Sequence, residues 1–99
     1  MSDDKKSFFL KLNPPRPTFG IDMTDSEKAI MQNHVTYWSK YVADGTVVVL
    51  GPVMDPKGVY GIAIVKVNSD EQLAQLIEAD PANGLNTYEF YPMRAVTKQ

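Results

Sequence analysis

The sequence predicts an α+β domain with the element order β-α-β-β-α-β. Three observations carry this prediction: a long amphipathic helical pattern over residues 24–45, two apolar runs joined by a tight turn over residues 46–67, and a shorter helical pattern over residues 69–79. Each helical pattern follows one run of strand composition and precedes another. This order is typical of an antiparallel sheet that carries two helices on one face.

Composition narrows the class of protein. The chain has 99 residues, no cysteine, one histidine and a formal net charge of −2. This length suits one domain, which we expect to span residues 1–99 with a flexible start over residues 1–6. Lysines and arginines are scattered, so we expect neither nucleic acid nor a membrane as partner. The absence of cysteine excludes zinc–sulfur sites, and we expect a cytoplasmic protein without a signal peptide.

The first strand is predicted over residues 7–12, an aromatic and aliphatic run. Residues 13–23 follow as an ordered or semi-ordered loop, because three prolines and a glycine prevent a continuous helix or a central strand. Arg16 lies among these prolines and is a candidate contact for an anion, since guanidinium groups pair with carboxylates and phosphates. A solvated loop charge is the alternative.

The helix over residues 24–45 is the element around which the chain is organised. Thr24 and Glu27 form a capping-box pattern at its start, and Gly45 is placed to end it with a left-handed cap. His34 lies on the apolar stripe of this helix, so it is expected to face the protein or a partner. Two interpretations stay open: a satisfied core histidine, or a general acid or base at the floor of a cleft.

Residues 46–53 and 59–67 are predicted to form a β-hairpin. The turn between them, at residues 55–58, has proline and glycine at positions that suit a type I turn. Both strands are apolar on nearly every residue, whereas a sheet with helices on one face needs one apolar face only. We therefore expect a homodimer, or a higher oligomer built from it, in which two sheets pack through their other faces.

The second helix is predicted over residues 69–79, with Ser69 and Gln72 as its start signal. It ends near Asp80, because a residue before proline disfavours helical geometry. The last strand is predicted over residues 85–96. Pro92 cannot donate to a ladder, so it is expected at a sheet edge or at the end of strand pairing. The complete order is the split βαβ arrangement of ferredoxin-like folds.

This topology offers His34 a partner. We expect the first and third strands to run side by side and parallel, so that the two helices also run parallel to each other. His34 lies ten residues beyond Thr24, and Asp80 lies eleven beyond Ser69. At about 1.5 Å per residue both lie about 15 Å from their helix starts, on helices about 8–10 Å apart. Asp80 is thus within reach of His34, and a solvated residue in an Asp-Pro turn is the alternative.

Several of these features, in this order, resemble the YCII-related family of the dimeric α/β barrel superfamily. They are the His34 helix ending at Gly45, the Gly51-Pro52-Val53 strand end, the Asp55-Pro56-Lys57-Gly58 turn before Tyr60-Gly61, the Ser69-Asp70-Glu71 helix start, and Asp80-Pro81. The resemblance covers residues 8–96, and the loop over residues 14–19 is similar to a subset of the family. It implies a ferredoxin-like domain that dimerises into a barrel-like assembly, with His34 and Asp80 in an active site.

The leading hypothesis is a small cofactor-free enzyme. Related proteins of the superfamily act on small cyclic or aromatic compounds as isomerases, lyases, dehalogenating enzymes or monooxygenases, which the resemblance implies as the substrate class here. In this hypothesis His34 is the general base or acid, Asp80 orients its imidazole, and Arg16 holds an anionic or phenolate oxygen.

Three aromatic residues are candidates for the wall of an apolar pocket. Trp38 lies one turn beyond His34, and Tyr37 and Tyr60 are the others. Core or interface positions are the alternative for all three. The rival function is a non-catalytic homodimer that binds a small metabolite or serves as an accessory subunit, with His34 packed inward and no cavity beside it. A haem- or metal-dependent reaction is a third possibility, for which the chain offers one obvious nitrogen ligand, His34.

Overall fold

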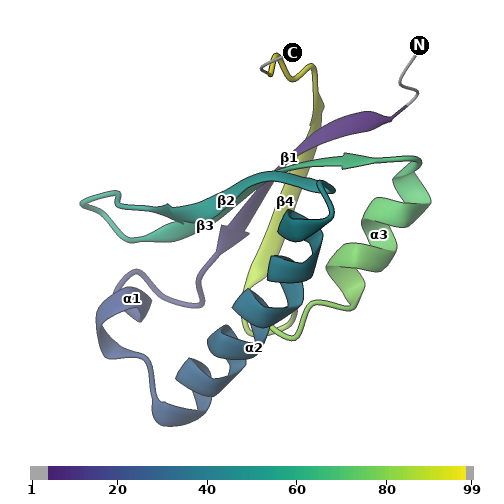
Figure 1. Cartoon of the computed structure of the whole chain (residues 1–99). Helices are drawn as coiled ribbons and strands as arrows, with labels where there is room; N and C mark the ends of the chain where they lie inside the picture. Colours follow the sequence, from purple (N-terminus) through teal and green to yellow (C-terminus); the bar gives the residue numbers. More distant parts are fainter. Residues whose placement is uncertain (1–4, 98–99) are drawn as a thin grey trace.

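The computed structural model describes residues 5–97 and confirms the α+β class. The elements in chain order are β1 (Lys6–Asn13), α1 (Phe19–Asp22), α2 (Asp25–Ala43), β2 (Val47–Val53), β3 (Tyr60–Val67), α3 (Asp70–Glu78) and β4 (Thr87–Met93). Figure 1 shows α2 and α3 on the same face of the sheet. Of the expected flexible start, residues 1–4 lie outside the described part of the chain, and Lys6 already belongs to β1.

The sheet has the strand order β2-β3-β1-β4, and every neighbouring pair is antiparallel. This is the ferredoxin-like arrangement that the sequence predicted. The expectation that β1 and β3 run parallel was wrong: Lys6 pairs with Val67 and Leu12 pairs with Gly61. The physical reason is the hairpin, which reverses β3 relative to β2 and inserts it between β1 and β2. Pro92 lies on the edge strand β4, as its missing N–H requires.

The two main helices consequently run antiparallel (Figure 1). The N–H of Lys66 donates to the carbonyl of Thr46 over 2.7 Å, which brings the end of α2 and the start of α3 to the same end of the sheet. Counting eleven residues back from Gly45 reaches His34, and counting eleven forward from Ser69 reaches Asp80. His34 and Asp80 therefore lie at equal distances from that shared end. The prediction that they are neighbours is correct, although the helices run antiparallel and not parallel.

The core lies between the helices and the sheet face that they cover. Alternate residues of β1 point to this side, because successive side chains of a strand face opposite ways. Trp38 of α2 is 1% exposed and is the largest fully buried side chain. The buried cluster consists of Phe8, Leu10, Trp38, Val47, Ala63, Val65, Val67, Leu73 and Leu76.

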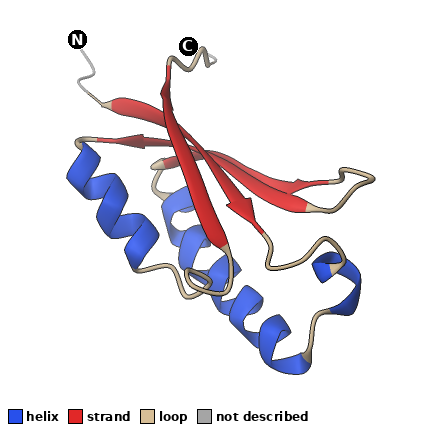
Figure 2. Cartoon of the chain, turned by 180° about the vertical axis from the view of Figure 1, so that it is seen from behind, coloured by secondary structure: helices blue, strands red, loops and turns tan. Residues whose placement is uncertain are grey.

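A one-turn helix, α1, interrupts the segment expected as a loop. It begins only after Pro17, so no proline lies within it, and it buries the ring of Phe19. Figure 2 shows α1 apart from α2 and α3, near the β2–β3 turn. The contact is close: a Cβ on Gly58, whose φ is +150°, would lie 3.0 Å from the carbonyl oxygen of Pro17. Glycine at this turn thus permits the segment to pack against the hairpin.

The other face of the sheet is not covered by any element within residues 5–97. Strand alternation and register place Phe9, Val49, Ile64 and Tyr91 side by side on it. Val49 is 48% exposed and Tyr91 is 54% exposed. Separately, no helix in the described chain is both long enough and apolar enough to cross a membrane.

Candidate active site

His34 and Asp80 form a buried pair between α2 and the loop after α3. The Nδ1 of His34 lies 3.0 Å from Oδ1 and 2.8 Å from Oδ2 of Asp80. The side chains are 11% and 0% exposed. Because an ionised carboxylate only accepts hydrogen bonds, this geometry assigns the donor role to an Nδ1–H.

The carboxylate of Asp80 is the centre of a network of donors. Besides His34, it accepts hydrogen bonds from Trp38 Nε1 at 2.9 Å, from the Ala82 backbone N–H at 2.9 Å and from the hydroxyl of Tyr88. Burial opposes ionisation, but the bonds from His34, Tyr88, Trp38 and Ala82 outweigh it and hold the pKa of Asp80 below its ordinary value. Asp80 is therefore a buried anion at neutral pH.

The chain directs this carboxylate inward through the turn that ends α3. Pro81 stops the helix, and the side chain of Asp80 then accepts from the backbone two residues on, at Ala82, in an Asx turn. The carbonyl of Asp80 also accepts from the N–H of Asn83 at 3.0 Å. Two local bonds thus hold Asp80 in place in addition to its contacts with α2.

A cavity of about 290 Å³ lies beside His34. Apolar residues from the sheet, α2 and the 14–23 segment form most of its wall, and His34, Asn86 and Tyr88 bring polar side-chain groups to it. Val35, which is 55% exposed, lies at the wall as well and marks the side on which the cavity meets solvent. The cavity is of the size and character of a small-molecule site.

The second ring nitrogen of His34 is the one available to a ligand. Within residues 5–97, no buried side-chain nitrogen or oxygen lacks a hydrogen-bond partner. The bonds of His34 in that part of the chain run through Nδ1 to Asp80. Nε2 therefore keeps access from the cavity wall, and with the proton on Nδ1 it carries the free lone pair.

Two of the three predicted aromatic residues line the cavity. Trp38 and Tyr60 are among its lining residues, and Trp38 also donates to Asp80. The ring of Tyr60 lies against Lys11, and strand alternation from Ile64 turns it to the opposite face of the sheet. Tyr37 does not belong to the wall: its hydroxyl donates to the carbonyl of Leu76 over 2.7 Å, and its ring packs edge-on against Trp38. Burial raises the pKa of Tyr37, with a further contribution from Tyr41.

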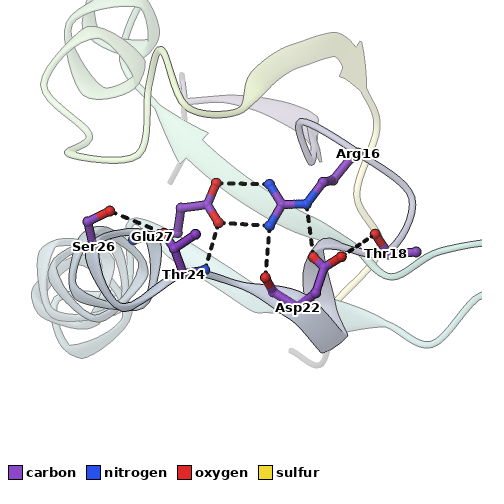
Figure 3. Close-up of polar contacts among 6 residues, drawn as sticks. All are labelled: Arg16, Thr18, Asp22, Thr24, Ser26 and Glu27. Atoms are coloured by element: carbon purple, nitrogen blue, oxygen red, sulfur yellow. Dashed lines mark hydrogen bonds and ion pairs between the residues drawn. The ribbon is translucent and has the colours of Figure 1, made fainter.

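Arg16 is used within the protein and is not among the residues of the cavity wall. Its Nη1 and Nη2 donate to the two carboxylate oxygens of Glu27 at 2.9 and 2.8 Å, and its Nε donates to Asp22 at 2.9 Å (Figure 3). Glu27 also accepts from the backbone N–H of Thr24 in the predicted capping box. These contacts tie the proline-rich segment to the first turn of α2.

The bond from Arg16 and the backbone N–H of Thr24 together lower the pKa of Glu27 from 4.5 to about 2. Asp22 also has a lowered pKa, mainly through the hydroxyl of Thr18 and then through Arg16. The cluster is an ion-pair network in which one guanidinium is bound by two carboxylates. The idea that Arg16 holds a substrate oxygen remains a prediction, and this geometry gives it no support.

Tyr88 and Asn86 are site residues that sequence reasoning missed. Burial and the Asp80 carboxylate raise the pKa of Tyr88, so it stays a neutral donor. The signal that could have identified Tyr88 is the alternation of side chains along residues 87–93. Tyr88 pairs with Leu12, which points to the face covered by the helices, so Tyr88 points to the same face. Asn86, 2% exposed, precedes the strand, and no periodic pattern marks it.

No group of three or more His, Asp or Glu side chains that would hold a metal ion occurs among the described residues. The fold and the site define a small ferredoxin-like α+β protein with a buried histidine–aspartate pair at an apolar cavity. The chain belongs to the YCII-related family, whose domain model matches residues 7–97. A comparison with curated proteins found no match.

Proposed function

We propose that this protein is a small cofactor-free enzyme in which His34 moves a proton to and from a small, cyclic or aromatic molecule bound in the cavity. One observation carries the proposal: a buried carboxylate fixes Nδ1 of the ring, while the same histidine lines an apolar cavity of about 290 Å³, large enough for a ligand. The expectation of a core histidine with no cavity beside it does not describe this arrangement.

The roles follow from the contacts. Nε2 takes a proton from the bound molecule, and the imidazolium that forms is stabilised by the Asp80 carboxylate against Nδ1–H. Nε2 then returns the proton to another atom of the same molecule or to its product. General acid–base catalysis of this kind contributes about 10²–10⁴-fold in rate. Trp38 and Tyr88 act through Asp80 and are positioning residues.

A non-catalytic ligand-binding protein is the second candidate. The apolar wall favours it, since such a cavity binds a small molecule without any proton transfer. The two candidates differ in one observable: only the enzyme exchanges protons with its ligand.

We also propose that two copies pair through the uncovered sheet face. Phe9, Val49 and Ile64 are adjacent there by register, and Tyr91 extends the patch across β4. Large apolar side chains gathered on one face are typical of a protein–protein interface. Lys11 and Glu89, paired on the same face, are placed to form polar contacts at the interface rim.

The test measures proton transfer without knowledge of the substrate. Small cyclic ketones and lactones are incubated in D₂O, and deuterium uptake beside the carbonyl is followed by NMR. We expect wild-type protein to catalyse the exchange and His34→Gln to lower its rate about 100-fold or more. Gln32→Ala, an exposed change on the same helix, is the matched control. Ligands that bind without exchange, or equal exchange by His34→Gln, would favour the binding protein.

A further inference from the structure

We infer that the cavity beside His34 selects an uncharged ligand and discriminates against anions. This inference rests on the proposed ligand site and states which chemistry that site accepts. It differs from the sequence-based hypothesis, in which Arg16 supplied a positive charge for an anionic oxygen.

The first observation is the composition of the cavity wall. None of its twenty residues is Asp, Glu, Lys or Arg. Apart from His34, its polar side chains are neutral hydrogen-bonding groups, and two of them are already engaged: Tyr88 donates to Asp80, and the amide of Asn86 contacts the sulfur of Met31 at 3.3 Å. A charged ligand would therefore lose its hydration without gaining an opposite charge, which is costly in an apolar site.

The second observation concerns the cations nearest to the cavity. Arg16 is bound to Asp22 and Glu27 through four hydrogen bonds. Lys11 lies on β1 between Leu10 and Leu12, which line the cavity, so strand alternation turns its side chain to the opposite face. There its ammonium group lies 4.6 Å from the centre of the Tyr60 ring. Neither residue supplies a charge to the cavity interior.

The third observation is the sign of the one fixed charge behind the wall. Asp80 is a buried carboxylate in contact with His34, and its side chain is 0% exposed. It repels an anion that approaches Nε2 from the cavity, yet it is shielded from direct contact with a ligand cation. Both charged forms of a ligand are thus disfavoured relative to a neutral form.

The size of the cavity indicates the scale of the ligand. An engineered apolar cavity of about 150 Å³ binds benzene, and this one measures about 290 Å³. One substituted ring fits the space. Benzamide, benzoate and benzamidine are suitable probes, because they share a ring and a planar head group but differ in charge.

The experiment measures binding of the three probes at a pH of about 8.5, about two units above the ordinary pKa of a histidine side chain. NMR signals of the His34 ring and the Trp38 indole N–H report binding at the cavity. We expect benzamide to bind at least about tenfold more tightly than benzoate or benzamidine, since tenfold corresponds to about 1.4 kcal/mol. Equal or tighter binding of benzoate overturns the inference, and so does the absence of benzamide binding.

A pair of variants tests the cause of the selectivity. Val35→Lys places a cation at the cavity wall, whereas Val42→Lys adds the same charge to an exposed site on the same helix away from the cavity. We expect Val35→Lys to raise benzoate affinity relative to benzamide about tenfold, and Val42→Lys to leave the ratio unchanged. Equal effects of the two variants would show that net charge, not the wall, controls selectivity and would overturn the inference.

These outcomes are separable from those of the proposed function. Selectivity is read from binding and needs no turnover. If benzamide binds selectively but no deuterium exchange occurs, the proposed enzyme fails and the uncharged-ligand inference stands. If exchange depends on His34 but benzoate binds best, the inference fails and the enzyme stands.

Discussion

The Nδ1 atom of His34 lies 2.8 Å from the Oδ2 atom of Asp80, a residue 46 positions further along the chain. The pair joins the middle of α2 to the turn that ends α3, and the sheet brings the two together by reversing β3 against β1. Asp80 is the only buried carboxylate among the described residues. The network around it therefore concerns the stability of the helix layer as well as the chemistry of the ring.

Replacement of Asp80 by Asn should destabilise the fold by about 2–4 kcal/mol. Trp38, Ala82 and Tyr88 all donate to the two oxygens, and His34 donates as well. An Asn side chain offers one oxygen and one NH₂, so either orientation sets a donor against a donor. Urea unfolding measures the loss. The control is Glu78→Gln, which also removes one negative charge but at an exposed position of α3. It should shift stability by less than about 0.5 kcal/mol.

Tyr88→Phe should cost about 1–2 kcal/mol and move the NMR signals of His34 and Trp38, because it removes one donor from Asp80. Tyr37→Phe loses a hydroxyl bond of similar kind, to the Leu76 carbonyl. It should cost a similar amount while leaving the His34 ring signals close to wild type. Equal spectral changes in the two variants would argue against a specific link from Tyr88 through Asp80.

The element order and the helix ends were largely predictable from local signals. The His34–Asp80 pair was also predicted, although from a parallel direction of β1 and β3 that was wrong. The capping box of Thr24 and Glu27 is present in the structure, and so is the side-chain cap of Ser69. Pro92 correctly placed β4 at the sheet edge. These signals are local because they depend on backbone donors within one turn or one strand.

What failed depended on relations between distant elements. The relative direction of β1 and β3 follows from how a hairpin inserts into a sheet, and no residue of either strand specifies it. The contacts of Arg16 and Tyr88 are with partners only 6 to 11 residues away, but they depend on how the intervening turns and helix ends place those side chains. For Arg16, whose contact with a substrate oxygen stays a prediction, the sequence spacing does not reveal that Glu27 and Asp22 converge on the guanidinium group.

The Arg16–Glu27 ion pair should make stability fall at acid pH. The pKa of Glu27 is lowered in the folded state to about 2 from its ordinary value of 4.5. The pair therefore contributes fully above pH 4.5, and its contribution is lost as the pH falls through that range toward 2. Glu27→Gln should have a lower melting temperature at neutral pH and a flatter dependence on pH below 4.5.

The control for this prediction is Glu71→Gln, an exposed change in the first turn of α3, which should retain the wild-type dependence. Hydrogen exchange gives a second measurement. Phe19, Gly20 and Met23 belong to the cavity wall, so loosening residues 14–23 in Glu27→Gln should speed exchange there and weaken ligand binding. If the stability of wild type and of Glu27→Gln fell equally steeply below pH 4.5, the role assigned to the Arg16–Glu27 pair would be contradicted.

Ile64→Glu should convert the proposed homodimer into a monomer. Ile64 pairs with Phe9 on one side and with Val49 on the other, so it lies within the apolar face of the sheet. A carboxylate at this position would be buried without a partner in the dimer. Sedimentation equilibrium should show a dimer for wild type and for Val42→Glu, the matched change on an exposed part of α2. A wild-type monomer at all accessible concentrations would refute the proposed interface.

The proposed role of His34 depends most on which of its two ring nitrogens carries the proton. Two-dimensional ¹H–¹⁵N NMR of the ring, at a pH where it is neutral, distinguishes the two tautomers directly. We expect the Nδ1–H form in wild type, since the Asp80 carboxylate can only accept from it, and a loss of that preference in Asp80→Asn. An Nε2–H tautomer in wild type would leave no free lone pair toward the cavity and would contradict the proposed role of His34.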